Sequence, residues 1–300
     1  MKMREQRIAI LIKDVIVAKL KKEIYSCNEN GINTSVQIES ISPQMLNDIK
    51  TPLGTPFHKN QMILTINIKT NQTIDELAWQ DYGIETVSNV LFAFFLSLDD
   101  IRTVYDRYGD RCKISSAIGS GLPLAIFKMP GKHGINLYYA NDASSAIYSD
   151  NYYINFKKNQ RSLFERILTK VKKFNNPYVR SSIITIHTVN WAKEDFFLIA
   201  VTVLFSCFEW LTNKGRYESF LAAVKRQTIS LTSVEEDTLD SFGFLRNAIA
   251  HPSVYLIIRT GRVYTITKKK DGTKKTFNID EIMSVRAILL RLMRKSIGVS

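Results

Sequence analysis

An arginine, an asparagine and a histidine lie within six positions of one another near the C-terminal third of the chain, as Arg246, Asn247 and His251. A histidine, whose unperturbed pKa is about 6.5, can accept or donate a proton at neutral pH. An arginine stays charged and can hold an anion through two parallel hydrogen bonds. Asn247 is an unfavourable residue inside a helix, and its amide can instead hold a neighbour or a phosphate oxygen. These residue types suit acid-base chemistry on an anionic substrate.

The spacing of Arg246 and His251 sets a condition on the local backbone. Five positions on a regular helix correspond to about 500°, which leaves the two side chains about 140° apart. His251 directly precedes Pro252, and the residue before a proline is disfavoured in the helical region. The sequence therefore predicts that the helix ends at His251, which lets the imidazole turn toward Arg246. The alternative is a capped helix end, in which His251 bonds terminal carbonyls and Arg246 pairs with an acid.

The elements that would position these residues belong to a helical second half. Helical periodicity predicts helices over 161–173, 178–193, 194–212, 233–250 and 280–296. Between the last two, residues 259–279 form two alternating runs around Lys270-Asp-Gly-Thr273, a strong β-hairpin signal. We therefore expect an all-α bundle with a β-hairpin insertion before the last helix.

The first half has a mixed pattern. Residues 4–24 carry apolar side chains at three-to-four spacing, which predicts an amphipathic helix, and residues 84–98 form a mostly apolar helix candidate. Alternation over 62–69 and short apolar runs at 124–127 and 135–139 predict strands. A polar connector over 141–150 places the boundary near residue 150. The expected organisation is an α+β domain over 1–150 and a helical domain over 151–300.

The segment Leu245-Arg-Asn-Ala-Ile-Ala-His251 resembles the signature of the HEPN family, in which an arginine and a polar residue are followed, after three more positions, by a histidine. The context is also similar to HEPN proteins of bacterial abortive-infection and toxin systems: an apolar helix over 196–211 with Glu209 near its end precedes the motif, and a hairpin follows it. The resemblance covers about 155–300. It implies a metal-independent ribonuclease that works as a homodimer, with Arg246 and His251 lining a cleft between two copies.

Under this resemblance the substrate is RNA, since without a metal the ribose 2′-hydroxyl is the available nucleophile. His251 would move the proton, Arg246 would hold the scissile phosphate, and Asn247 would orient one of them. Glu209 and Tyr255 are further cleft candidates, although Glu209 can equally cap its own helix.

Biologically, the resemblance implies toxin activity or anti-phage defence, with a partner antitoxin or a phage-derived trigger. The N-terminal domain would sense the trigger or restrain the active site. The chain departs from some toxin members at one point, because they carry a tyrosine two residues after the histidine that a partner can modify. Here Pro252 and Ser253 follow the histidine, and the nearest tyrosine is Tyr255.

Charge favours an anionic partner. The formal net charge is +13, and residues 246–300 contain twelve lysines and arginines against three acids. Candidate phosphate contacts are the hairpin lysines Lys268, Lys269, Lys270, Lys274 and Lys275. A solvated, merely charged hairpin tip is the alternative, since such tips are commonly charged.

Several classes of protein are not indicated. The cysteines Cys27, Cys112 and Cys207 are far apart and odd in number, which supports neither disulfides nor a zinc site, and no metal or other cofactor is expected. The most apolar stretch, 196–208, is shorter than the roughly 20 residues of a membrane crossing, so we expect a buried helix there. The cysteine pattern makes a reduced cytoplasm the expected location.

Two other functions fit the same features. The second half could be a non-catalytic HEPN-like module that binds nucleotides or RNA or mediates dimerisation, or a purely structural dimerisation domain whose chain acts through its N-terminal half.

Overall fold

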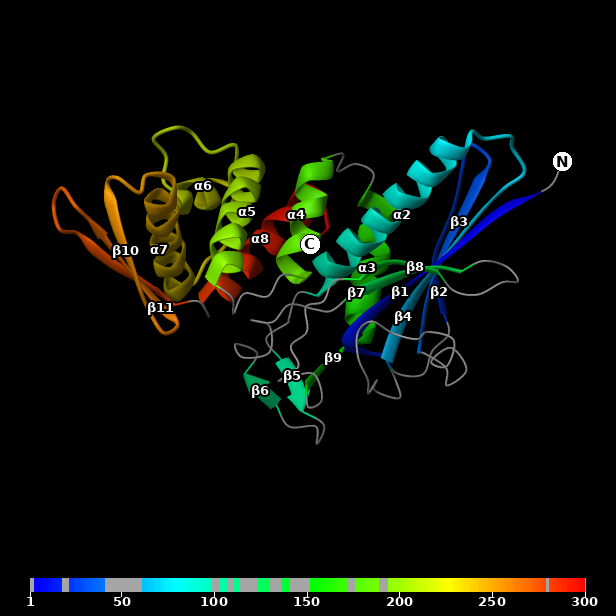
Figure 1. Cartoon of the computed structure of the whole chain (residues 1–300), viewed down its shortest axis with the longest axis horizontal. Helices are drawn as coiled ribbons and strands as arrows, with labels where there is room; N and C mark the ends of the chain where they lie inside the picture. The colour runs from blue at the N-terminus through cyan, green and yellow to red at the C-terminus, as the bar shows by residue number, and fades with distance from the viewer. Residues whose placement is uncertain are drawn as a thin grey trace. The chain divides into compact units, whose positions relative to one another are not determined.

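The computed structural model describes residues 3–17, 22–40, 61–98, 103–106, 111–113, 124–129, 136–140, 152–171, 176–188, 194–278 and 281–299. The chain divides into two compact units, Met1–Val189 and Asn190–Ser300. The first unit consists of an antiparallel sheet region with helices, and the second of helices with a small sheet before the last helix (Figure 1). The coarse expectation of a mixed α and β chain is therefore confirmed.

The centre of the N-terminal sheet is β1 (Arg4–Ile16). On one edge it pairs antiparallel with β4 (Gln61–Thr70); on the other it pairs antiparallel with β7 (Leu124–Met129) and parallel with β9 (Tyr152–Asn155). The remaining described strands extend this sheet on both sides. They are β2 (Lys22–Glu29), β3 (Ile32–Ser40), β5 (Thr103–Asp106), β6 (Arg111–Lys113) and β8 (Asn136–Ala140).

The helix predicted over 4–24 is wrong, because this segment forms β1 and β2. Every residue from Ile8 to Ile12 is at most 5% exposed, so both faces of β1 are covered. A strand buried on both faces shows a continuous apolar run instead of alternation, and such a run also satisfies helical spacing. Its three isoleucines, being β-branched, favour the extended backbone. The strands predicted over 62–69, 124–127 and 135–139 are confirmed by β4, β7 and β8.

Three helices lie within the described residues of the first unit: α2 (Glu76–Ser97), α3 (Lys158–Lys170) and α4 (Pro177–Thr188). The C-terminal half of α2 is buried, and its Phe94 ring lies 5.3 Å from Phe156 and 6.1 Å from Phe164 of α3. Both α3 and α4 pack on α2. The apolar surface of α2 thus draws these two helices into the first unit. The units divide after Val189, whereas the sequence predicts a boundary near 150; the connector 141–150 lies outside the described residues.

The helices of the second unit are α5 (Glu194–Thr212), α6 (Phe220–Arg226), α7 (Ser233–Ala250) and α8 (Ile282–Ser296). Phenylalanine rings connect three of them: Phe208 of α5 lies 6.1 Å from Phe220 of α6, which lies 5.6 Å from Phe242 of α7. Phe242 in turn lies 6.5 Å from Phe277, which belongs to the last strand of the small sheet. The helices predicted over 194–212, 233–250 and 280–296 are confirmed, while the short α6 was not predicted.

The small sheet contains three antiparallel strands: β10 (Tyr255–Thr260), β11 (Val263–Lys268) and β12 (Lys274–Asn278). The predicted hairpin turn joins β11 to β12, and Gly272 there has a φ of +69°. The additional strand β10 was not predicted. It reaches β11 through a two-residue turn at Gly261, whose φ of +60° suits glycine at the first position of a type II′ turn. The buried face of the sheet packs on α7.

Candidate functional site

The last turn of α7 is fixed by burial on one side and ends at the histidine of the motif. Leu245 and Ala248 are completely buried. His251 is the C-cap, with φ −132° and ψ 64°, and its backbone N–H donates to the Asn247 carbonyl at 2.9 Å. The prediction that the helix ends at the residue before Pro252 is therefore confirmed, and its cause is the steric demand of the proline.

Arg246 faces α5 and is held in a fixed plane. Its guanidinium carbon lies 3.5 Å from the centroid of the Phe205 ring, a stacking contact between cation and aromatic face. Nη1 donates to Asn247 Oδ1 at 2.8 Å, and Nη2 lies 3.8 Å from Glu209 Oε1. Phe205 and Glu209 are one turn apart on α5, so a single helix face supplies both contacts.

The electrostatics of Arg246 combine partial burial with one nearby acid. The Arg246 side chain is 26% exposed and that of Glu209 is 40% exposed. Burial lowers the pKa of Arg246, and the Glu209 carboxylate opposes this by favouring the charged form. An arginine remains charged at neutral pH regardless. Its Nε is buried and bonds no described residue.

His251 stands apart from this group. Its side chain is exposed, and the imidazole forms no hydrogen bond or ion pair with any residue in the described ranges. The contacts of Arg246 are to Phe205, Asn247 and Glu209. Within one chain, Phe205, Asn247 and Glu209 thus surround Arg246, whereas the His251 side chain lies at the exposed end of the helix and contacts none of them.

The turn between β11 and β12 lies against the residues that follow the motif. The backbone N–H of Lys269 donates to the Val254 carbonyl at 2.9 Å, and its ammonium donates to the Ser253 carbonyl at 3.0 Å. Tyr255 packs edge-on against Phe244, with ring centroids 5.3 Å apart. The basic turn is thereby tied to the backbone just after His251, and Tyr255 serves first as a packing residue.

The hairpin lysines differ in what they contact. Lys268 pairs with Asp271 at 2.7 Å, which raises the lysine pKa and lowers that of Asp271 to about 2. Lys275 pairs with Asp240 of α7. Lys270 and Lys274 are the two hairpin lysines whose side chains are exposed and bond no described residue. These two have the greatest freedom to contact an anion.

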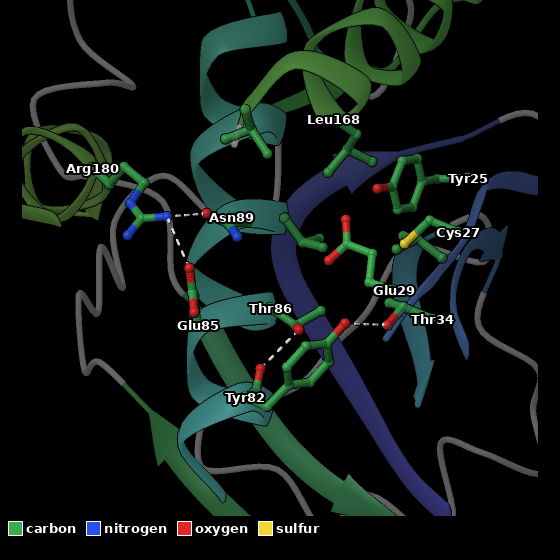
Figure 2. Close-up of a pocket in the computed structure, with 13 residues that line it drawn as sticks. Tyr25, Cys27, Glu29, Thr34, Tyr82, Glu85, Thr86, Asn89, Leu168 and Arg180 are labelled. Carbon is green, nitrogen blue, oxygen red and sulfur yellow. Dashed lines mark hydrogen bonds and ion pairs between the residues drawn. The ribbon is translucent and has the colours of Figure 1, made fainter. Parts of the chain in front are cut away.

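The first unit contains a cavity of about 280 Å³ that was not predicted from the sequence (Figure 2). It lies between one face of β2 and β3 and the side of α2, and the end of α3 and part of α4 close it. Tyr25, Cys27 and Glu29 occupy alternate positions on β2, so they project to the same face of the sheet. These three residues lie just after the helix predicted over 4–24, and no strand was predicted there, so their shared face was not recognised from the sequence.

Hydroxyl groups line the side of the cavity near the sheet. The hydroxyls of Tyr82 and Thr34 are 3.0 Å apart, and Thr86 donates to the Tyr82 carbonyl at 2.8 Å. Burial raises the pKa of Tyr82, and burial together with a hydrogen bond to Cys27 raises that of Tyr25. Both phenols therefore remain neutral across the physiological range.

A buried arginine closes the opposite side of the cavity. The Arg180 side chain is only 8% exposed; its Nη1 donates to Asn89 Oδ1 and lies 3.8 Å from Glu85 Oε1. Figure 2 shows these three residues converging at α2. Asn89 and Arg180 are 91 positions apart in sequence, so no local pattern could have paired them.

Comparison of the chain with protein-family models, with curated proteins and with solved structures gives no match. Among the described residues, no helix has the length and apolarity to cross a membrane. The described histidine, cysteine, aspartate and glutamate side chains form no group of three suited to hold a metal ion.

Proposed function

We propose that the protein is a metal-independent endoribonuclease of the HEPN type that acts in bacterial anti-phage defence or as a toxin. The observation that carries the proposal is the fixed, partly exposed guanidinium of Arg246 at the end of the helix that His251 terminates. A planar cation stacked on Phe205 and bonded by Asn247 is preorganised for a phosphate. The exposed Lys270 and Lys274 add positive charge on the neighbouring turn.

The proposed reaction is an internal transfer within RNA. His251 takes the proton from a ribose 2′-hydroxyl, the 2′-oxygen attacks the adjacent phosphorus, and the bond to the 5′-oxygen breaks. A second acid returns a proton to that leaving oxygen, and Arg246 neutralises charge on the phosphate. Because His251 lies outside the contacts of Arg246 in one chain, a homodimer with two histidines at a shared cleft would supply both proton-transfer groups. The first unit would sense a phage-derived trigger or restrain this site.

A second candidate is a non-catalytic module that binds RNA or nucleotides. The absence of a contact between His251 and Arg246 in one chain favours it, since RNA binding by Arg246, Lys270 and Lys274 needs no proton transfer. RNA binding without cleavage by the wild-type chain would support this candidate.

The test is cleavage of mixed RNA in EDTA by the wild type, His251→Ala and His187→Ala, the last altering a histidine on α4 of the first unit. We expect the wild type and His187→Ala to cleave equally, and His251→Ala to lose about 10²-fold or more in rate, the contribution typical of a general acid or base. RNA carrying 2′-deoxyribose at the cleaved position should be resistant. Undiminished cleavage by His251→Ala would exclude the proposed mechanism.

A further inference from the structure

The strand β10 forms one edge of the small sheet, and among the described strands it pairs only with β11. The backbone N–H of Lys269 donates to the Val254 carbonyl at 2.9 Å and extends the β10–β11 ladder by one position. Hydrogen-bonded residues alternate along an antiparallel pair. Every second residue from Val254 onward therefore bonds β11, and the intervening Tyr255, Ile257 and Arg259 direct their main-chain groups to the open edge. Those of Tyr255 and Ile257 bond no described residue.

This edge lacks most of the features by which proteins block the addition of a strand. Natural edge strands are protected by proline, by a bulge, by brevity or by charged side chains. β10 contains six residues without a proline, and its register with β11 is continuous from Tyr255 to Thr260. Its single charged residue, Arg259, lies near the turn that follows. An extended chain can therefore add to this edge as a further strand.

An apolar row accompanies the open main chain on the outer face of the sheet. The row consists of Val254, Leu256 and Ile258, which are 42%, 48% and 48% exposed. They alternate along the chain, so their side chains share one face. Side chains at alternate positions of an added strand would lie beside this row on the same face. The strand that best fits this edge therefore has apolar residues at alternate positions.

Both ends of the edge are basic. Arg262 is exposed in the turn after β10, and Lys269 and Lys270 are exposed in the turn near the start of β10. The small sheet and its turns contain one acid, Asp271, with which Lys268 pairs at 2.7 Å. An added strand with acidic residues at its two ends would meet positive charge at both, which favours an acidic partner.

A second copy of this chain and a strand of RNA are poorer matches to the same edge. Two copies of β10 paired antiparallel about Ile257 would bring the Arg262 turn of each close to the Lys269 turn of the other, and such juxtaposed like charges oppose association. RNA cannot continue a β ladder, and the exposed row is aliphatic, whereas nucleobases stack on aromatic side chains. These features favour a polypeptide of opposite charge.

From the open ladder, the apolar row and the two basic turns, we infer that β10 binds an extended acidic segment of a partner protein as a fourth strand of the small sheet. The main chain of this segment pairs with the open edge, its alternate apolar residues cover the row, and its terminal acids lie beside the basic turns. This binding does not depend on the proposed RNA cleavage, because it uses neither Arg246 nor His251.

The first arm of the test compares two capped peptides on the full-length wild type by fluorescence anisotropy. In both, three valines alternate with two threonines; one peptide has two glutamates at each end and the other has two lysines. We expect the acidic peptide to bind at least about tenfold more tightly. Equal binding, tighter binding of the basic peptide, or no binding of the acidic peptide would each overturn the inference.

The second arm locates the peptide by hydrogen exchange at single amides, measured by NMR on the full-length chain. Saturating acidic peptide should slow exchange of the Tyr255 and Ile257 amides several-fold, because these point to the open edge. The Leu256 and Ile258 amides, which already bond β11, should change less. Binding without protection of Tyr255 and Ile257 would place the peptide elsewhere. Protection of the same amides by mixed RNA, and not by the peptide, would assign the edge to nucleic acid. Either result would overturn the inference.

The third arm blocks the edge with proline. Ile257→Pro removes an N–H that points away from β11, so the β10–β11 bonds stay, and its ring obstructs an added strand. We expect at least about tenfold weaker binding of the acidic peptide. The matched control is Thr276→Pro on β12, the opposite edge of the sheet, where the same alternation directs the N–H away from β11. This control should bind as the wild type does, and equal losses in both variants would contradict the assignment to β10.

Two further measurements accompany the proline variants. Unchanged thermal unfolding confirms that each variant folds, and the first two arms need only the wild type if one of them does not. Sedimentation equilibrium without peptide tests the rival occupant. A wild-type dimer that dissociates in Ile257→Pro and persists in Thr276→Pro would assign the edge to a second copy of the chain, and would overturn the inference of an acidic partner.

Discussion

Arg180 and Arg246 belong to different compact units, yet each guanidinium has the same kinds of partner. Arg180 donates to an asparagine Oδ1 and lies 3.8 Å from a glutamate; Arg246 does the same with Asn247 and Glu209. In both, Nε is buried and bonds no described residue. The chemical partners alone therefore do not distinguish a structural arginine from one that is available to a ligand.

The difference lies in exposure and in the ring beneath the guanidinium. The Arg180 side chain is 8% exposed, whereas that of Arg246 is 26% exposed and stacks on Phe205 at 3.5 Å. A stacked, partly exposed guanidinium has its plane fixed while one edge stays accessible. Arg180 instead joins α4 to α2 and orients Asn89 in the wall of the cavity. The comparison suggests a binding role for Arg246 and a positioning role for Arg180.

The largest expected effect is on the rate of RNA cleavage, which should depend on Arg246 and not on Arg180. Arg246→Lys retains the charge but loses the planar donor pair and the stacking, so the rate of RNA cleavage should fall about 10²- to 10³-fold, as for loss of one preorganised donor. Arg180→Lys should leave the rate unchanged. Single-turnover cleavage of a labelled RNA measures both, and equal losses would mean that Arg246 acts only through the fold.

The free energy of unfolding should depend more on Arg180 than on Arg246, the reverse of the order expected for RNA cleavage. Arg180→Met leaves the buried Asn89 Oδ1 acceptor without its donor, which costs about 1 to 3 kcal/mol. Arg246→Met removes the more exposed contacts to Glu209 and Asn247, while the methionine thioether can still pack on the Phe205 ring, so the loss should be below about 1 kcal/mol. Hydrogen exchange of the α2 and α7 amides reads each unit separately. Greater destabilisation of α7 by Arg246→Met than of α2 by Arg180→Met would reverse the assigned roles.

The same pair of arginines shows what the sequence could reveal. Asn247 adjoins Arg246, and Pro252 marks the helix end, so a short motif contained most of that site. Phe205 was seen only as part of an apolar helix, because nothing in a local pattern tells which ring will meet a cation. Asn89 and Arg180 are 91 positions apart and come together only through the packing of α4 on α2.

How well each helix or strand was predicted depended on whether it is buried on one face or on both. The longer helices of the second unit, α5, α7 and α8, keep a helical periodicity in the sequence, and their predicted bounds were close. β1 is buried on both faces, which erases the alternation that identifies a strand, and its isoleucine-rich run was mistaken for a helix. The predicted helix also covered the start of β2, and the residues of β2 that line the cavity were not assigned to a strand.

A smaller effect tests the ring that distinguishes Arg246. Phe205→Leu keeps most of the apolar volume and removes the aromatic face, which is worth about 0.5 to 2 kcal/mol to a stacked cation. RNA cleavage should therefore fall between about 2- and 30-fold. Phe205→Tyr keeps the ring and should retain most of the activity. If leucine and tyrosine behave alike, the stacking does not contribute to function.

The smallest expected effect is on the salt dependence of RNA binding by the hairpin lysines. Two of these lysines pair with an acid in the free chain, and two do not. Substituting Lys270 and Lys274 by glutamine should lower the slope of log affinity against log salt by about 0.7 for each phosphate contact to single-stranded RNA. Substituting Lys268 and Lys275, which pair with Asp271 and Asp240, should change the slope less. Fluorescence anisotropy with the RNA over a range of salt gives both slopes. Equal changes in slope would show that these ion pairs open when RNA binds. The ion pairs of the free chain would then not decide which lysines of this turn contact phosphate.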